Sequence, residues 1–303
     1  MSLVVRLPDR WVNAHVFEQY LGLDGSPHES TSAVVRVVVP SNCHLMIDAV
    51  VRLLSLLNQL DHCTKRVIVD FGDSETEVFG YLNRVGFLDQ LSPTIEVLPN
   101  RPSVSGAQQF WGKNRGVVEI VRVERSVIDD TLPTTLSNAV GQACAARPDS
   151  LELEGAVWTI FAELISNVVD HSQTSLVGFA ALQVYRGANC VKIAVSDSGL
   201  GIMQTLRPTI KQEKPRLAHL SDVELLVEVL RAGLSRHGED RGCGLKGCAD
   251  KALKYQAELD LRLPSSRMML QPTRGAYAAN QASCFECLPL IWGTHLCFTM
   301  QLD

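Results

Sequence analysis

The segment from Leu153 to His171 most constrains how this chain can fold, because it has helical periodicity and no Gly or Pro after Gly155. Its apolar residues recur on one side of the predicted helix: Phe161, Leu164, Ile165, Val168 and Val169. Its polar residues share another side: Glu163, Asn167, Asp170 and His171. Such a polar face is typical of an ordinary surface helix. A carboxylate and an amide one turn apart can also serve a metal–phosphate site, since the amide oxygen can ligate Mg²⁺ and the carboxylate can activate a water.

A strand is predicted from Cys190 to Asp197, and it ends in a carboxylate. Apolar residues alternate along this strand, and Asp197 continues their face. A buried carboxylate needs a partner, since an unpaired buried charge is costly, and the exocyclic amine of adenine is a suitable donor. The next residues, Ser198-Gly199-Leu200-Gly201-Ile202, contain glycines that allow backbone to approach a flat ring or a phosphate closely. The same residues are also typical of an ordinary turn.

A second glycine cluster, from Arg241 to Gly247, precedes a helix that is predicted from Cys248 to Leu259. Glycine-rich backbone at a helix N-terminus presents free N–H groups to anionic oxygens. A final strand is predicted from Gly293 to Leu302, with an apolar face that Thr294 heads. Its buried residues are expected to be Leu296, Phe298, Met300 and Leu302.

These four segments together resemble the GHKL ATPase superfamily, which includes gyrase, heat-shock chaperones, histidine kinases and MutL. The matching boxes, in order, are Glu163-x3-Asn167-x3-His171, Asp197-Ser-Gly199-Leu-Gly201-Ile202, Gly242-Cys-Gly244-Leu245 and Gly293-Thr294. Their order and approximate spacing match over about residues 130 to 303. The resemblance implies an α/β fold, the two-layer Bergerat sandwich, which holds ATP between its sheet and helices under a mobile lid.

The resemblance also implies roles for the residues around the base and the metal. Asn167 would ligate Mg²⁺, and Glu163 would be the general base or would position the attacking water. Asp197 would accept a hydrogen bond from adenine, and Thr294 would support Asp197 through a water. The residues beside the base would be Gly199, Gly201 and Ile202. Two further residues would belong to the nucleotide side of the helix, Asp170 and His171, with His171 favoured as a packing or supporting residue over a phosphorylation site.

The phosphates would be held by backbone N–H groups of the second glycine cluster, namely Gly242, Gly244 and Leu245. The lid would run roughly from Met203 to Arg241. Cationic residues near enough in sequence to meet phosphate charge are Arg236, His237, Arg241 and Lys246. Lys246 stands where many members of the superfamily have a small residue, so it could contact the phosphates or point to solvent.

No dimerisation helix with a phospho-accepting histidine is predicted before residue 150, which argues against a sensor histidine kinase. The residues Val168–Ser172 and Gly233–Arg236 are most similar to compact bacterial ATP-binding proteins related to anti-sigma serine kinases.

The N-terminal half predicts a small α/β domain over residues 33–125, after an extension of residues 1–32 and before the ATP-binding domain of residues 126–303. Strands are predicted at 33–39 and 66–71, each followed by a helical pattern. The part from about residue 33 to residue 100 resembles a STAS-type regulatory domain. The likeness rests on a strand ending in Asp70-Phe71 and a helix that begins near Ser74. A small α/β layer without a ligand is the alternative.

Composition narrows the class of protein. A formal charge of −5 gives no basic surface for nucleic acid, no apolar run is long enough to span a membrane, and the N-terminus lacks a secretion signal. Nine cysteines, an odd number, indicate free thiols in a reducing cytoplasm. Cys284 and Cys287 could contribute to a zinc site with His295 and Cys297, but their spacing matches no standard zinc module, and packed free thiols are the favoured alternative.

Three functions remain open at this stage. The first is an ATPase whose lid closure is coupled to a partner or to the N-terminal domain, because Glu163 is the residue that hydrolysis needs. The second is a serine or histidine protein kinase of the anti-sigma type. The third is a nucleotide-sensing interaction module in which turnover is incidental. All three predict ATP, Mg²⁺ and a protein partner, and a homodimer is possible.

Overall fold

The computed structural model describes residues 2–303 except 73–75, 115, 125–129, 172–173, 233–243 and 273–282, with only the backbone path described for 169–171 and 283–284. The chain is a mixed α/β protein with one parallel and one antiparallel main sheet, which confirms the predicted class. The parallel sheet has the strand order β1-β3-β5-β6. Its strands are β1 (Ser2–Arg6), β3 (Val34–Val38), β5 (Arg66–Asp70) and β6 (Glu96–Leu98).

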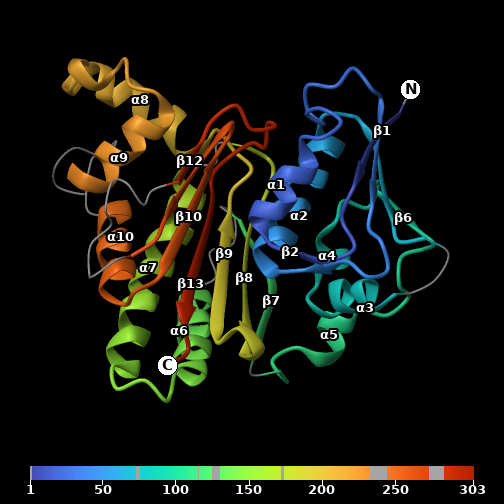
Figure 1. Cartoon of the computed structure of the whole chain (residues 1–303), viewed down its shortest axis with the longest axis horizontal. Helices are drawn as coiled ribbons and strands as arrows, with labels where there is room; N and C mark the ends of the chain where they lie inside the picture. Colours follow the sequence, from blue (N-terminus) through green and yellow to red (C-terminus); the bar gives the residue numbers. More distant parts are fainter. Residues whose placement is uncertain are drawn as a thin grey trace.

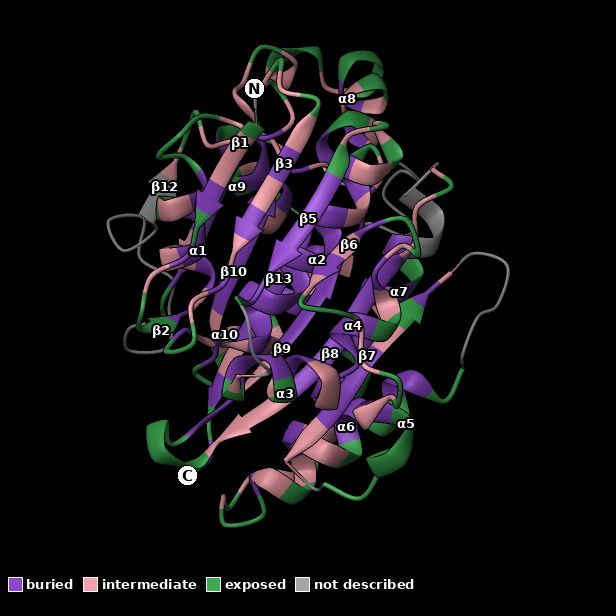
Figure 2. Cartoon of the chain, turned by 90° about the vertical axis from the view of Figure 1, so that its right-hand side faces the viewer, coloured by how far each residue is buried: buried purple, intermediate pink, exposed green. Residues whose placement is uncertain are grey.

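The helices that connect these strands carry the apolar faces that cover the parallel sheet. They are α1 (Ala14–Leu21), α2 (Ile47–His62), α3 (Glu77–Arg84) and α4 (Phe87–Gln90), followed by the short α5 (Gly106–Phe110). A two-stranded ribbon of β2 (Trp11–Val12) and β4 (His44–Leu45) runs beside them. Figure 2 looks onto the other face of the parallel sheet, where residues along β3 alternate between buried and half-buried.

The structure differs from the predicted domain boundary at residue 33. Residues 2–6 are not part of an extension, because β1 pairs in parallel with β3 and forms an edge of the sheet. The strand and helix pattern predicted for residues 33–86 is confirmed by β3, α2, β5 and α3. β1 was not predicted, because five residues are too few for their periodicity to distinguish a strand from irregular structure.

The antiparallel sheet has seven strands in the order β12-β11-β10-β13-β9-β8-β7. They are β7 (Val117–Val123), β8 (Gly178–Tyr185), β9 (Cys190–Ser196), β10 (Glu258–Leu263), β11 (Ser266–Leu270), β12 (Ser283–Phe285) and β13 (His295–Gln301). β7 pairs with β8, so the predicted boundary at residue 125 is also displaced, and this strand belongs to the second sheet.

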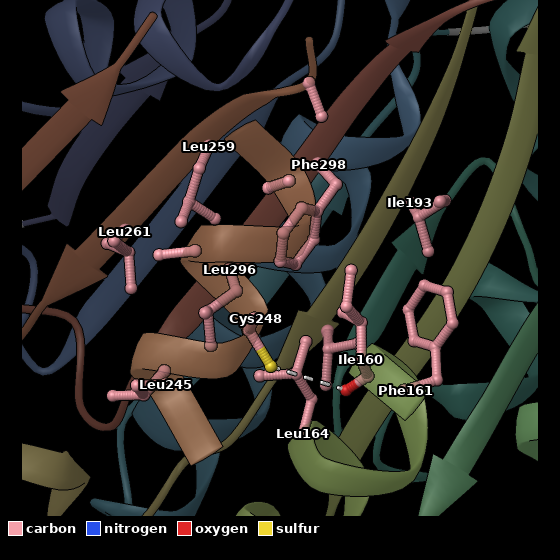
Figure 3. Packing of buried hydrophobic residues seen from close by; sticks show 14 of the residues in the cluster. Ile160, Phe161, Leu164, Ile193, Leu245, Cys248, Leu259, Leu261, Leu296 and Phe298 are labelled. Atoms are coloured by element: carbon pink, nitrogen blue, oxygen red, sulfur yellow. Dashed lines mark hydrogen bonds between the residues drawn. The ribbon is translucent and has the colours of Figure 1, made fainter. Parts of the chain in front are cut away.

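One face of the antiparallel sheet is covered by the helices α6 (Leu132–Ala143), α7 (Ser150–His171) and α10 (Gly244–Lys254), with α8 (Gly201–Glu213) and α9 (Asp222–Ala232) above them (Figure 1). Figure 3 shows the core between α7, α10 and the strands, where Phe161, Leu164, Leu245 and Phe298 meet. The helix predicted to end at Leu259 ends at Lys254 instead. Gln256 adopts a left-handed φ of 58°, and β10 then begins at Glu258 to pair with β13.

The other face of the antiparallel sheet packs against α2, which therefore lies between the two sheets (Figure 1). Phe179, Ala181 and Ala194 of β8 and β9 join the same apolar core as α2. β13 is consequently buried on both faces, so His295 and Cys297 are as inaccessible as the expected core residues. Sequence periodicity predicted only one buried face, because it cannot show that a second domain covers the sheet.

Candidate functional site

Five predicted site residues line one small cavity between the antiparallel sheet and its helices. Asn167 comes from α7, Asp197 follows β9, Ile202 lies in α8, Leu245 in α10, and Thr294 precedes β13. Apolar side chains complete the lining: Leu164, Val168 and Leu296. The cavity volume is about 20 Å³, which holds about one water molecule.

Asp197 is the buried charged residue in the lining of this cavity, with 3 % of its surface exposed. Its Oδ1 accepts a hydrogen bond from Gly199 N–H at 2.5 Å, and its Oδ2 accepts one from Thr294 N–H at 2.9 Å. Burial raises the pKa of Asp197 from 3.8 to about 6, although the two backbone donors act in the opposite direction. The carboxylate is thus held in place by neutral donors, and each of its oxygens retains acceptor capacity.

Thr294 supports Asp197 directly through the backbone, and it also fixes the turn that follows Asp197. The Asp197 N–H donates to the Thr294 carbonyl at 2.9 Å, and the Ile202 N–H donates to Thr294 Oγ1 at 2.9 Å. These bonds join the end of β9, the start of α8 and the start of β13 into one rigid unit. The Thr294 backbone thus contacts the Asp197 carboxylate directly.

Two glycines are required for this close packing. Gly293 has a φ of +89°, and a Cβ there would overlap the Asp197 carbonyl oxygen. Gly201 has a φ of +76°, and a Cβ there would lie 3.1 Å from the Gly293 carbonyl oxygen. Any side chain at Gly293 would both strain the backbone and displace Asp197. The predicted glycine roles therefore have a structural reason here that is independent of any ligand.

Glu163 lies against the N-terminus of α10. A Cβ on Gly244 would overlap Glu163 Oε1, so the carboxylate sits directly against this glycine. Asn167 is one turn further along α7 and is half-buried at the cavity. The first backbone N–H groups of α10 have no partners within the helix, and the helix dipole favours anions at this end. A carboxylate and an amide thus flank a helix end that is suited to an anionic oxygen.

Helix α2 contacts the back of this site, which sequence reasoning missed. Gln59 donates from Nε2 to Ser198 Oγ at 3.1 Å and to the Trp292 carbonyl at 3.0 Å, and accepts from the Trp292 N–H at 2.9 Å. Ser55 Oγ and Ser196 Oγ are 3.0 Å apart. The available signal was that two polar residues, four apart, lie among the leucines of this helix.

A buried ion network beside this contact was also missed. It joins Glu18 and Arg52 of α1 and α2 to the antiparallel sheet, through Arg52 Nη2 to Asp260 Oδ2 at 2.8 Å and Arg262 Nε to Glu18 Oε1 at 2.9 Å. Arg267 Nε contacts Asp260 Oδ1 at 2.7 Å. Separating the two domains would break the Arg52–Asp260 and Arg262–Glu18 pairs, whose charges are almost inaccessible.

Several predicted residues lie outside the described part of the chain: the side chains of Asp170 and His171, and the loop residues Arg236, His237, Arg241 and Gly242. Lys246 is half-buried in the first turn of α10. Cys287 is exposed, whereas the side chain of Cys284 is not described. Among the side chains that are described, no three of His, Cys, Asp or Glu converge as a metal site would require.

No protein-family model matches this chain. The comparison with curated proteins likewise found no similar sequence. Within the described segments, no helix has both the length and the hydrophobicity needed to cross a bilayer.

Proposed function

We propose that this protein binds ATP with Mg²⁺ and hydrolyses it slowly, in a C-terminal domain of the GHKL type with a Bergerat sandwich. The observation that carries this proposal is the convergence of Asn167, Asp197, Ile202, Leu245 and Thr294 on one cavity from five separate elements. Residues scattered over about 130 positions of sequence line one cavity, which supports the proposal. The layer of α6, α7 and α10 over an antiparallel sheet supports the fold assignment.

Adenine recognition is assigned to Asp197. Its carboxylate is buried, is fixed by two backbone donors and retains acceptor capacity, so an exocyclic amine is a suitable additional partner. A bound base would lie against the apolar side chains of the cavity. Because the cavity is too small for a base in this conformation, binding would require its lining elements to move, as a lid in the segment between Ile202 and Leu245 would allow.

Glu163 and Asn167 fit the metal and phosphate side of the site. An amide oxygen is an acceptable Mg²⁺ ligand, and a carboxylate beside the N-terminus of α10 can orient a water near the terminal phosphate. Bound Mg²⁺ would supply charge neutralisation for the phosphates. Asn167 would hold the ion, and Glu163 would accept the proton of the attacking water.

Two measurements test this proposal. Calorimetric titration with ATP and Mg²⁺ should show one saturable site that is lost or weakened at least tenfold in D197N, because hydrogen bonds to charged groups contribute about 1.5–3 kcal/mol. Phosphate release should fall to background in E163Q while binding is retained. E154Q is the matched control, since Glu154 also lies on α7 against a glycine, Gly141 of α6. Absence of ATP binding, or equal turnover in E163Q and E154Q, would reject the proposal.

A nucleotide-sensing module is the second candidate, and the contact of Gln59 with Ser198 and Trp292 favours it. A base that moves Asp197 would also shift these neighbours and thus α2 of the N-terminal domain. This function predicts partner or domain rearrangement on ATP binding that persists in E163Q. The anti-sigma kinase assignment, the STAS likeness and a homodimer stay predictions from sequence.

A further inference from the structure

A second cleft, of about 190 Å³, lies on the N-terminal domain away from the candidate ATP site. Its lining combines aromatic and polar side chains: Trp11, Cys43, His44, Leu45, Glu77 and Tyr81 are joined by three others. Two of the others, Gln183 and Tyr185, come from β8 of the antiparallel sheet. The volume is below the roughly 300 Å³ of pockets for drug-sized ligands, so it fits a small molecule.

The position of this cleft is the one where α/β domains bind ligands. Trp11 lies in β2, which follows β1, His44 in β4, which follows β3, and Glu77 begins α3, which follows β5, so these residues come from the elements that follow three adjacent parallel strands. Crevices outside the carboxyl ends of parallel strands are the usual ligand sites of open α/β sheets. The fold therefore supplies a reason for a site here that is independent of the side chains.

Trp11 provides an accessible aromatic surface in this cleft. Its ring stacks on His44 with a centroid distance of 5.0 Å, yet 58 % of the residue surface is exposed. The exposed part of the ring is available to pack against a ligand. Here the stack with His44 also holds the indole in one orientation, which lowers the entropy lost when a ligand packs against it.

The polar groups behind the aromatic surface are firmly placed. Tyr81 Oη donates to Gln183 Oε1 at 2.5 Å, Tyr185 Oη donates to the same oxygen at 3.2 Å, and the Ile47 N–H donates to Tyr185 Oη at 2.8 Å. These bonds tie the floor of the cleft to both domains. A ligand in the cleft would therefore contact two structural units at once.

The charges around the cleft are mainly negative. Glu77 lines it and has no ion-pair partner among the described residues. The carboxylate of Asp9 is close enough to Cys43 to raise the pKa of its thiol further, beyond the larger effect of burial. Asp48 lies near Tyr81 and Tyr185, but Lys192 Nζ contacts its Oδ2 at 3.1 Å and offsets its charge. Asp9 and Glu77 remain to attract a cation.

We propose that this cleft binds a small organic cation, an ammonium or guanidinium ion, packed against the Trp11 ring and neutralised by Glu77. Aromatic faces attract such cations through the ring quadrupole, and Trp does so most strongly. The carboxylate supplies the opposite charge, and the cleft volume of about 190 Å³ suits a ligand of a few heavy atoms. This site does not depend on ATP binding.

Calorimetric titration of the full chain with choline, with guanidinium, and with the uncharged carbon isostere of choline tests the proposal. At least one of the two cations should bind at a single saturable site, and the isostere should bind at least fivefold more weakly. W11L and E77Q should each weaken binding of that cation roughly threefold to thirtyfold, the range expected for loss of a cation–π contact or its counter-charge.

Matched variants control for loss of folding. W111L removes another exposed Trp, 55 % accessible, and D24N removes another exposed carboxylate, both outside the cleft lining. These two should bind the cation like the unaltered protein, and all four variants should keep its thermal transition. No saturable binding of either cation, equal binding of the uncharged isostere, or equal loss in W111L and W11L would overturn the proposal.

Discussion

Ionisation of Asp197 should destabilise the protein when no nucleotide is bound. Its carboxyl is buried, and its hydrogen-bond donors among the described residues are neutral, so its pKa is raised from 3.8 to about 6. The folded state therefore holds this proton more tightly than the unfolded state. The resulting stability is fully present below about pH 4 and is lost as pH rises through about 6. A shift of about two units corresponds to roughly 3 kcal/mol.

D197N removes this titration and allows the effect to be measured. The free energy of unfolding of both proteins is measured in urea at about pH 5 and about pH 7.5. Relative to D197N, the unaltered protein should lose about 1.4 kcal/mol of stability between these pH values, which is about half of the total expected from the pKa shift. The new amide places an NH₂ group against one backbone N–H, which adds an offset that does not vary with pH. The slope is thus diagnostic, and a difference that stays constant within about 0.3 kcal/mol would refute the reasoning.

The same carboxylate predicts the pH dependence of nucleoside binding, on the proposed adenine contact. The exocyclic amine donates only to the ionised carboxylate, so affinity should rise about tenfold between about pH 5 and about pH 7.5. Adenosine is the suitable probe because it has no phosphates that titrate in this range. Affinity measured by calorimetry should be independent of pH in D197N. Tighter binding at the lower pH would contradict the contact.

Three further predictions concern the packing of the site. Gly293→Ala should lower the free energy of unfolding by several kcal/mol in a urea titration. Gly25 has a similar φ of +96° and no atom within 4 Å of an added Cβ, so Gly25→Ala should lower the free energy of unfolding by only about 1 kcal/mol, through backbone strain. Gln59→Leu should weaken the affinity for ATP about tenfold in calorimetry. Asn58→Leu removes hydrogen bonds of the same helix to Gln90 and Ser92 and should leave the affinity unchanged. Arg52→Met should destabilise by about 3 kcal/mol in urea, since two buried carboxylates lose a cation; an unchanged midpoint would contradict this.

The elements that form the site could be predicted because their signals are local. Helical periodicity located α7, alternation located β9 and β13, and glycine runs located the turns next to them. Asn167, Asp197 and Thr294, which the resemblance grouped in one site, line one cavity in the structure. The direct backbone contact of Thr294 with Asp197 could not be predicted, because it depends on the register of β13 against β9.

Long-range pairing explains what sequence reasoning missed. β1 and β7 were assigned to the wrong units because a strand's own residues do not name its partner, and β7 pairs with β8 across about 60 residues of sequence. The end of α10 was overestimated because apolar residues at Ala257 and Leu259 continue a helical spacing although they belong to the strand region. In that case sheet pairing with β13 prevailed over local periodicity.

Helix α2 of the N-terminal domain contacts the antiparallel sheet behind the candidate ATP site, so the two domains are joined there. Successive side chains of an extended segment point to opposite faces, and the chain at the end of β9 does this across the sheet: Asp197 lines the cavity, while Ser196 and Ser198 contact Ser55 and Gln59 of α2. Displacement of Asp197 by a ligand must therefore shift its two neighbours, since the backbone that joins them is hydrogen-bonded to β13. The domains are also joined by the buried ions of Glu18 and Arg52, so α2 cannot move independently of the sheet. On the proposed function, a ligand at Asp197 would therefore move α2 and the sheet together rather than loosen the contact between them.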